Sequence, residues 1–408
     1  MSTSQPSARP AWRSAQMIIL AGVLISILTN GPRTSMGLFL PPMTDEFGWS
    51  RETFALALAL QNLVWGISQP IVGGIADKYG TTRVILGGAV TYVAALLLMS
   101  QADAPFLLHL SAGIMMGAAI GACSFGIVIT AFSRLLPPEK RQVGFGIATA
   151  GGSLGQFLFA PISQGFISAY GWQLALVLTA AMLMTVLALA PVLAGKNEKA
   201  TLDMPDQSLR EAVREALRER SYVLLLVGFF VCGFQVAFIN AHLPAYIVDL
   251  GLAAKWGAWS IALIGLFNII GSYGAGVLSG SHSRPKMLAG IYLLRALAFL
   301  VFLMVPVSVP SVLIFSSVMG VLWLSTVPPT SGIVVSMFGP RWMGLLWGLV
   351  FLNHQFGSFL GVWLGGRLYD QTGSYDVVWW LSVVLGLAAA LIHWPISDAP
   401  VARLKEAA

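Results

Sequence analysis

Residues 17–40 read MIILAGVLISILTNGPRTSMGLFL, an apolar run that contains a single charged residue, Arg33. A helix that crosses a bilayer needs about 20 mostly apolar residues, so the run predicts a first membrane span at 17–42. Arginine keeps its proton in proteins, and burial near the bilayer centre costs at least ~2.5–3.5 kcal/mol. We therefore expect Arg33 either to bind an anion or to be a structural cation paired inside the protein.

The whole chain has the composition of a membrane protein. Of its 408 residues, 57% are hydrophobic and only 10% are charged, whereas soluble domains carry roughly 25% charged residues. The net charge of +6 does not indicate nucleic-acid binding, because Lys and Arg of membrane proteins collect in loops on one side. Cys123 and Cys232 lie far apart in apolar runs and predict packing residues rather than a metal site.

Apolar runs separated by charged or turn-rich breaks predict twelve spans. They cover 17–42, 53–75, 82–101, 106–132, 143–168, 172–194, 221–248, 256–279, 287–306, 310–336, 342–366 and 376–396. The stretch REAVREALRER at 210–220 spaces Glu and Arg at helical intervals and predicts a short amphipathic helix in a linker.

The two sets of six spans repeat each other. LPPMTDEFGWS at 40–50 resembles LPAYIVDLGLA at 243–253. We predict an all-α membrane protein with two pseudo-symmetric six-helix bundles, at 1–194 and 221–408, joined by a cytoplasmic linker at 195–220. A parallel repeat of this kind places a substrate site near the midplane, between the halves.

The distribution of basic residues predicts the orientation of the chain. Most Lys and Arg fall on the side of the two termini, whereas the opposite loops hold only Arg51, Lys255 and Arg367 beside several acids. By the positive-inside rule both termini are cytoplasmic, in a cell inner membrane. Arg33 and Arg295 fall within spans.

The loop GGIADKYGTTR at 73–83 resembles the signature between the second and third helices of the major facilitator superfamily. The resemblance implies that Asp77 and Arg83 help to latch the cytoplasmic ends of the halves in an outward-open state. The alternative is a solvated turn whose charge only sets orientation. The matching loop of the second half, GVLSGSHSRPK, lacks the acid.

Two blocks resemble, within that superfamily, the monocarboxylate and oxalate–formate porter group. They are GPRTSMGLFLPPMTDEFGWSRET at 31–53 and GFGIATAGGSLGQFLFAPISQGFISAYGWQLAL at 144–176. The resemblance implies that a basic residue of the first helix, here Arg33, binds the substrate carboxylate. The eighth helix departs from the family pattern, because GLFNIIGSYG at 265–274 carries Asn268 and Ser272 where an arginine is usual.

Polar residues inside the spans complete the predicted binding set. His354, in FLNHQFG, is the candidate for a second binding group, since imidazole titrates near pH ~6.5; its alternative is a hydrogen-bonded packing residue. Asn240 and His242 precede Pro244 and predict either a gate or binding role or a structural kink; Asn240 belongs to the predicted binding set. Neutral hydrogen-bonding groups complete the set: Asn30, Asn268, Ser272 and Tyr273.

These patterns predict a secondary active transporter that carries a small organic anion, a monocarboxylate moved with a proton. Neither an ATP-binding loop nor a nucleophile elbow is present, so we expect no enzyme activity and no cofactor. The expected partners are the substrate, protons and the lipid bilayer, with the chain a monomer. An exporter of amphipathic or neutral compounds is the alternative, although the spans lack the acid that proton-coupled exporters need. A third alternative is a membrane sensor or assembly partner that transports nothing.

Overall fold

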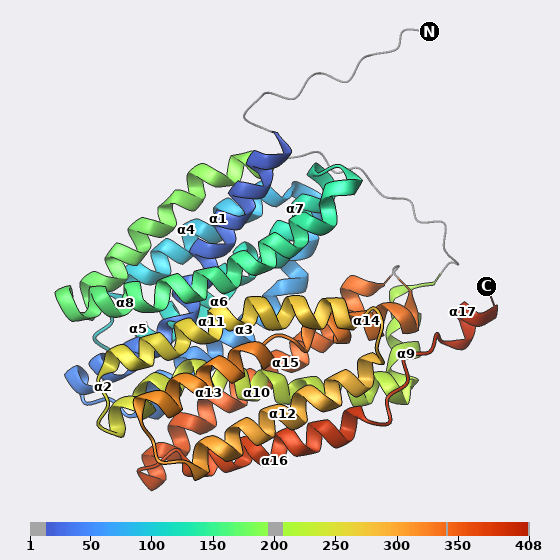
Figure 1. Cartoon of the computed structure of the whole chain (residues 1–408). Helices are drawn as coiled ribbons and strands as arrows, with labels where there is room; N and C mark the ends of the chain where they lie inside the picture. Colours follow the sequence, from blue (N-terminus) through green and yellow to red (C-terminus); the bar gives the residue numbers. More distant parts are fainter. Residues whose placement is uncertain (1–13, 195–206, 340–341, 407–408) are drawn as a thin grey trace.

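The computed structural model describes residues 14–194, 207–339 and 342–406, and every regular element in these ranges is a helix. The helices form two bundles, the first in blue to green and the second in yellow to red (Figure 1). The first bundle contains α1 (Ala15–Thr34), η2 (Met36–Phe39), α2 (Leu40–Phe47), α3 (Arg51–Tyr79), α4 (Thr81–Met99), α5 (Pro105–Leu108), η3 (His109–Met115), α6 (Met116–Cys123), α7 (Phe125–Leu135), α8 (Pro138–Leu189) and η4 (Ala190–Leu193).

The second bundle follows the short helix α9 (Leu209–Arg218). It contains α10 (Arg220–Asp249), α11 (Ala254–Leu278), α12 (Arg284–Met304), α13 (Val309–Leu322), α14 (Val327–Phe338), α15 (Met343–Thr372), α16 (Asp376–His393) and α17 (Ala402–Glu406). Helices α9, α14 and α17 lie at one end of the molecule, called here the α9 end, and α2 and α5 lie at the other (Figure 1).

The predicted membrane-spanning architecture is confirmed. The described residues contain 11 helical stretches that are long and apolar enough to cross a membrane. One of them, Gly146–Leu193, contains a break at Gly171, where φ is 79° and ψ is 166°. Such a backbone conformation favours glycine, and it divides this stretch into the predicted fifth and sixth spans. The twelve predicted spans are therefore present.

The first span is broken just after Arg33. Helix α1 continues through Pro32 and ends at Thr34. Hydroxyl groups replace the missing backbone donors at this helix end: Thr34 Oγ1 donates to the Gly31 carbonyl at 2.9 Å, and Ser35 Oγ donates to the same carbonyl at 3.1 Å. Arg33 therefore lies in the last turn of a helix that ends inside the bundle.

The tenth span is also broken, between α13 and α14, and Arg295 stabilises the break. Its guanidinium is fully buried and donates to the carbonyls of Leu322 and Trp323, at the end of α13. On the other side of the break, the Asn268 amide oxygen accepts from the Leu324 N–H at 3.0 Å. A cation beside carbonyls at a helix C-terminus is favourable, so Arg295 is a structural cation.

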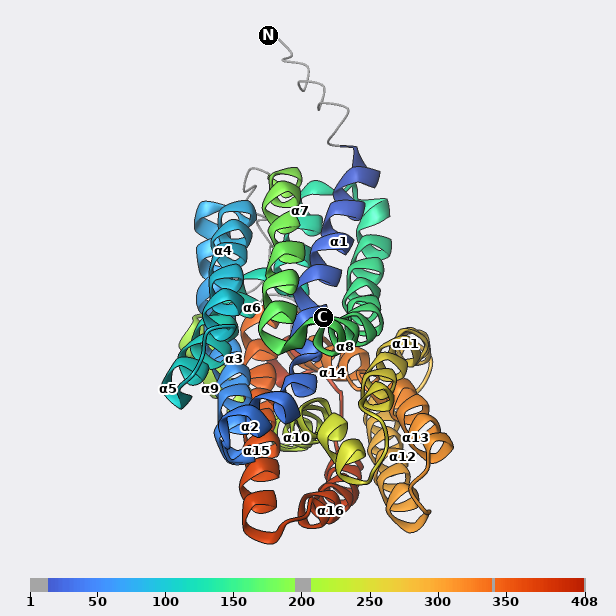
Figure 2. The ribbon, with the colours of Figure 1, turned by 90° about the vertical axis from the view of Figure 1, so that its left-hand side faces the viewer.

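The two bundles meet along two helix pairs, α3 with α15 and α8 with α11, which lie side by side in Figure 2. Contact is close at the end opposite α9: a Cβ placed on Gly366 of α15 would meet the Arg51 carbonyl of α3 at 2.7 Å. The contact between the halves continues to the middle of α3 and α15, where a Cβ placed on Gly66 would meet the Gln355 side chain at 2.8 Å.

The same helices lose contact toward the α9 end. A Cβ placed on Gly73 or Gly74 of α3, or on Gly344 or Gly348 of α15, would meet nothing within 4 Å. The halves are thus closed against each other at the end opposite α9 and separated at the α9 end. This is one of the two states that alternating access requires.

Packing of α10 against α15 supplies a test of the fold. A Cβ on Gly357 of α15 would come within 2.0 Å of the Phe230 carbonyl of α10, so Gly357→Ala is expected to destabilise the protein by about 1–3 kcal/mol. The measurement is the Tm in detergent. The matched control is Gly348→Ala in the same helix, where the added methyl has free space and alanine favours the helix. Equal Tm values for the two variants would contradict this packing.

Candidate functional site

Arg33 lies in the interior of the first bundle and faces α3. Its Nη2 donates to Asn62 Oδ1 at 3.2 Å, and its guanidinium carbon lies 4.4 Å from the centroid of the Trp65 ring. Its Nε is buried and makes no hydrogen bond to any part of the chain that the structure describes. Within the same residues, no carboxylate pairs with it.

Aromatic rings connect Arg33 with the other half of the molecule. Trp65 of α3 makes an edge contact with Phe351 of α15, with ring centroids 5.1 Å apart. Phe351 stacks on His354, with centroids 5.8 Å apart and planes only 8° from parallel. Arg33 and His354, predicted as the two main binding groups, are therefore brought into one cluster that crosses the interface between the bundles.

The contacts of Arg33 leave one of its donors without an acceptor. The side chain is half-buried, its guanidinium has the Asn62 oxygen and the Trp65 ring as partners, and its Nε has none in the described residues. An anion beside the guanidinium would supply the missing acceptor.

His354 is almost fully buried, 8% exposed. Its Nδ1 lies 3.2 Å from Gln355 Oε1, and its ring also lies against Phe229, with centroids 5.0 Å apart. Gln355 Oε1 further accepts from the Ser358 hydroxyl at 3.1 Å. These contacts fix the orientation of the imidazole beside Phe351.

Two predicted binding residues hold the α8–α11 contact instead. The Asn268 amide nitrogen donates to Ser153 Oγ at 2.9 Å, across the interface between the halves. Its oxygen accepts from Ser272 Oγ at 2.9 Å and from the Leu324 N–H. The Asn268 amide therefore has partners for both its nitrogen and its oxygen, and none of the hydrogen bonds of Asn268 and Ser272 in the described residues involves the Arg33 cluster.

Two other predicted binding residues, Tyr273 and Asn30, lie in different surroundings from each other. Tyr273 is 75% exposed, on the same side of α11 as the exposed Ile270 and Val277, so it is not brought to the cluster. Asn30 donates to the Gly152 carbonyl at 2.8 Å and ties α1 to α8.

Asn240 lies at the interface, because its backbone oxygen would be 2.2 Å from a Cβ on Gly37 of η2. Its buried side-chain oxygen has no hydrogen-bond partner among the residues described. Since η2 begins three residues after Arg33, Asn240 remains the neutral residue best placed to join the site.

A second cluster joins the halves at the end opposite α9. Arg51, the first residue of α3, makes a two-pronged ion pair with Asp249 at the end of α10, with both N–O distances 2.6 Å. Arg367 of α15 pairs with Glu52 at 3.2 Å. We call these four residues, with Asp370 and Tyr375, the closed-end network.

Asp370 and Tyr375 extend this network. The Asp370 carboxylate accepts the backbone N–H groups of Arg51 and Glu52 at 3.0 and 2.7 Å. A residue of the second half therefore caps the first turn of α3, where a negative charge is favourable. The Tyr375 hydroxyl accepts from Arg51 Nη1 at 2.9 Å.

His242 supports Tyr375. Its Nε2 lies 2.8 Å from the Val362 carbonyl and must donate to it, so the other nitrogen, 3.1 Å from the Tyr375 hydroxyl, is an acceptor. Burial raises the pKa of Tyr375, although Arg51 opposes that shift. Tyr375 therefore keeps its proton and donates to His242. The roles predicted for this segment, a gate or binding role or a structural kink, stay predictions.

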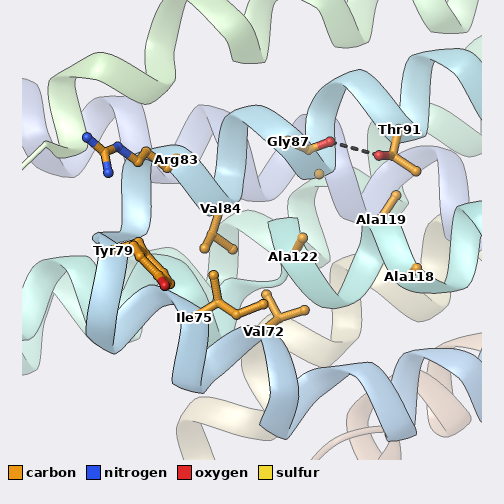
Figure 3. A pocket seen from close by; sticks show the side chains of 11 residues that line it. Val72, Ile75, Tyr79, Arg83, Val84, Gly87, Thr91, Ala118, Ala119 and Ala122 are labelled. Carbon is orange, nitrogen blue, oxygen red and sulfur yellow. Dashed lines mark hydrogen bonds between the residues drawn. The ribbon is translucent and has the colours of Figure 1, made fainter.

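The predicted latch at the α9 end stays a prediction. The side chain of Asp77 lies outside the described residues. Arg83 is exposed and forms no ion pair with the described part of the chain. It lies at one end of a surface groove of about 430 Å3 between α3, α4 and α6, lined elsewhere by apolar and small residues such as Ile75, Val84 and Ala122 (Figure 3).

Comparison with known proteins identifies the family. The sequence profile of the Major Facilitator Superfamily matches residues 20–362, and the chain belongs to this family. It is 25% identical to the uncharacterized MFS-type transporter YcxA of Bacillus subtilis, over 97% of this chain and 98% of that one. It is 26% identical to monocarboxylate transporter 11 of Homo sapiens, over 96% of this chain and 84% of that one.

Solved structures share the fold. A bacterial homologue of the human lysosomal transporter Spinster, in an inward-facing and unoccupied conformation, superimposes with a TM-score of 0.74 at 15% identity, over 95% of this chain and 97% of that one. A D-xylose–proton symporter superimposes with a TM-score of 0.71 at 13% identity, over 93% and 97%. The chain is thus a multi-pass membrane transporter and not an enzyme.

The closed-end network supplies a test of its role. Asp249→Asn removes the charge opposite Arg51 and is expected to disfavour closure by about 1 kcal/mol, roughly a fivefold change in the ratio of closed to open molecules. Spin labels on Asp45→Cys and Lys255→Cys, one on each half, should then show more of a longer distance. Native Cys123 and Cys232 are buried and do not compete for label.

The matched control is Asp376→Asn, which removes an exposed carboxylate at the same end that makes no ion pair with the described residues. It should leave the distance distribution unchanged. If Asp249→Asn behaves like this control, the network does not hold the halves together.

Proposed function

We propose that this chain is a secondary active transporter that carries a small organic anion, a monocarboxylate, together with a proton. The observation that carries the proposal is Arg33: a guanidinium that contacts Asn62 and Trp65 of α3, with a buried Nε that has no partner and no carboxylate beside it in the described residues. Its planar fork of donors matches the two oxygens of a carboxylate.

The number of cations at this site favours a monoanion. Ser272 occupies the position where the resembling porters carry an arginine, and Arg295 is occupied by backbone carbonyls. His354 is then the second group that would donate a hydrogen bond, and Asn240 the neutral group that would shape selectivity. The similarity to monocarboxylate transporter 11 supports this substrate class.

In this proposal, transport occurs because the two ends of the molecule open alternately. In the state described, the halves are separated at the α9 end, and substrate reaches Arg33 from that side. Opening of the other end requires the closed-end network to break while the α9 end closes. We place the α9 end, with both termini, in the cytoplasm of a bacterial-type inner membrane, because most basic residues lie on that side.

Two groups are candidates to carry the coupled proton in this proposal. No acid lies in the interior of a predicted span, since Asp376 is the first residue of the last one, so the proton would travel on the substrate carboxylate or on His354. The likeness to a proton symporter concerns the fold alone. The drug-export alternative is favoured by one feature, the aromatic surface of Trp65 and Phe351, which would also bind an uncharged amphipathic compound.

Substitution of Arg33 tests the substrate class. In liposomes with an imposed pH gradient, Arg33→Gln is expected to lower uptake of monocarboxylates by at least about tenfold, because the attraction between unit charges about 4 Å apart, on the order of 4 kcal/mol near a protein surface, is lost. Arg220→Gln, the same substitution at an exposed arginine at the start of α10, is the control. Unchanged uptake by Arg33→Gln would overturn the anion proposal.

Ligand-induced stabilisation separates the two substrate classes without a transport assay. A ligand at about 100 times its Kd stabilises the folded state by about 2.7 kcal/mol. We expect monocarboxylates to raise the Tm of the wild type and not of Arg33→Gln. Neutral amphipathic compounds that raise both Tm values equally, with no effect of any carboxylate, would identify the exporter instead.

A further inference from the structure

Helix α9, Leu209–Arg218, divides into three stripes along its length. Residues four apart lie on the same side of a helix, and here each such series has one chemical character. The apolar series is Leu209, Val213 and Leu217, the basic series is Arg210, Arg214 and Arg218, and the acidic series is Glu211, Glu215 and Glu219. Ala212 and Ala216 lie between the acidic and apolar series.

The protein covers only part of this helix. Ala212 and Ala216 are buried against the second bundle, where α9 contacts α10. On the acidic stripe, Glu215 pairs with Arg403 of α17 at 3.5 Å and accepts from the Gln207 amide at 2.8 Å. The alanine side of α9 and Glu215 therefore face the protein, whereas Glu211 is exposed and caps the start of the helix with Ser208.

The apolar and basic stripes are left open. Leu209 and Leu217 are each 53% exposed, and the three arginines of the basic stripe are exposed without an ion pair to any described residue. Side chains of the two stripes line one shallow hollow, and within the described residues no other element borders it. An exposed apolar stripe beside unpaired cations is the pattern of a helix that lies in a membrane surface.

The position of α9 agrees with that pattern. Only Glu219, in an extended conformation (φ −78°, ψ 111°), separates it from Arg220, where the membrane-spanning helix α10 begins. This residue breaks the helix at the depth where α10 enters the bilayer. Figure 1 shows α9 at that end of the second bundle.

We propose that α9 is an interfacial helix that binds anionic phospholipid on the termini side of the membrane. Leu209, Val213 and Leu217 enter the boundary between headgroups and acyl chains, and the basic stripe binds headgroup phosphates. Charge decides the partner. Three arginines without an ion pair in the described residues lie beside an apolar surface and complement anionic lipid, whereas the acidic stripe lies away from that apolar surface and its Glu215 is paired with Arg403. Binding anchors the link between the two moving halves to the membrane surface.

The test uses the full chain in nanodiscs, labelled with an environment-sensitive fluorophore at Val213→Cys. With phosphatidylglycerol present we expect blue-shifted emission and quenching by brominated lipid, and both should weaken in phosphatidylcholine alone and in high salt. Each arginine near an anionic surface contributes a factor of about five to partitioning, so the triple Arg→Gln variant should partition about a hundredfold less. The triple Arg→Lys variant keeps the charge and should behave like the parent.

The wild-type salt and lipid dependence needs no substitution in the basic stripe, so a folding defect cannot produce the expected result. Emission that is blue-shifted equally in both lipids and in the Arg→Gln variant would mean that protein covers this face, for example the first bundle, and would overturn the proposal. Emission typical of water, with no quenching by brominated lipid, would overturn it as well.

Discussion

The structure depends on the way a permanent positive charge is accommodated inside an apolar bundle. Two guanidiniums face this constraint and meet it differently. Arg295 donates to the carbonyls left open where α13 ends, so its charge is balanced within one half. Arg33 has one amide oxygen and one aromatic face, and its Nε has no described partner. Since a buried donor without a partner costs free energy, only Arg33 gains substantially from an external anion.

Helices α3 and α15 link this charge to the state of the transporter. Helix α3 begins with Arg51 in the closed-end network and presents Asn62 and Trp65 to Arg33 about three turns later. Helix α15 carries Arg367 near the same end and His354 in the middle. A movement that separates these two helices at one end must therefore also change the distance between Trp65 and Phe351.

The sequence was sufficient for the fold because hydropathy and repeats act over whole spans. It also predicted Arg33 and His354 as binding groups, since a charge or imidazole in an apolar run is conspicuous. It did not indicate the partners of Asn268, whose polar groups are used in helix contacts that only the packing of α8 and α11 defines. It also missed the closed-end network. Arg51, Asp249 and Asp370 are ordinary charged helix ends in the sequence, and 198 or more residues separate Arg51 from its partners.

The closed-end network and the Arg33 site impose opposite electrostatic requirements during a cycle. The network balances its own charges when closed, so it stabilises the state described without any substrate. Closing the α9 end instead would shut Arg33 away from water, and the attraction of a carboxylate for a cation grows as water is removed. Without an anion that closure leaves the charge uncompensated. In the proposed cycle, substrate therefore favours exchange between the two states more than an empty site does.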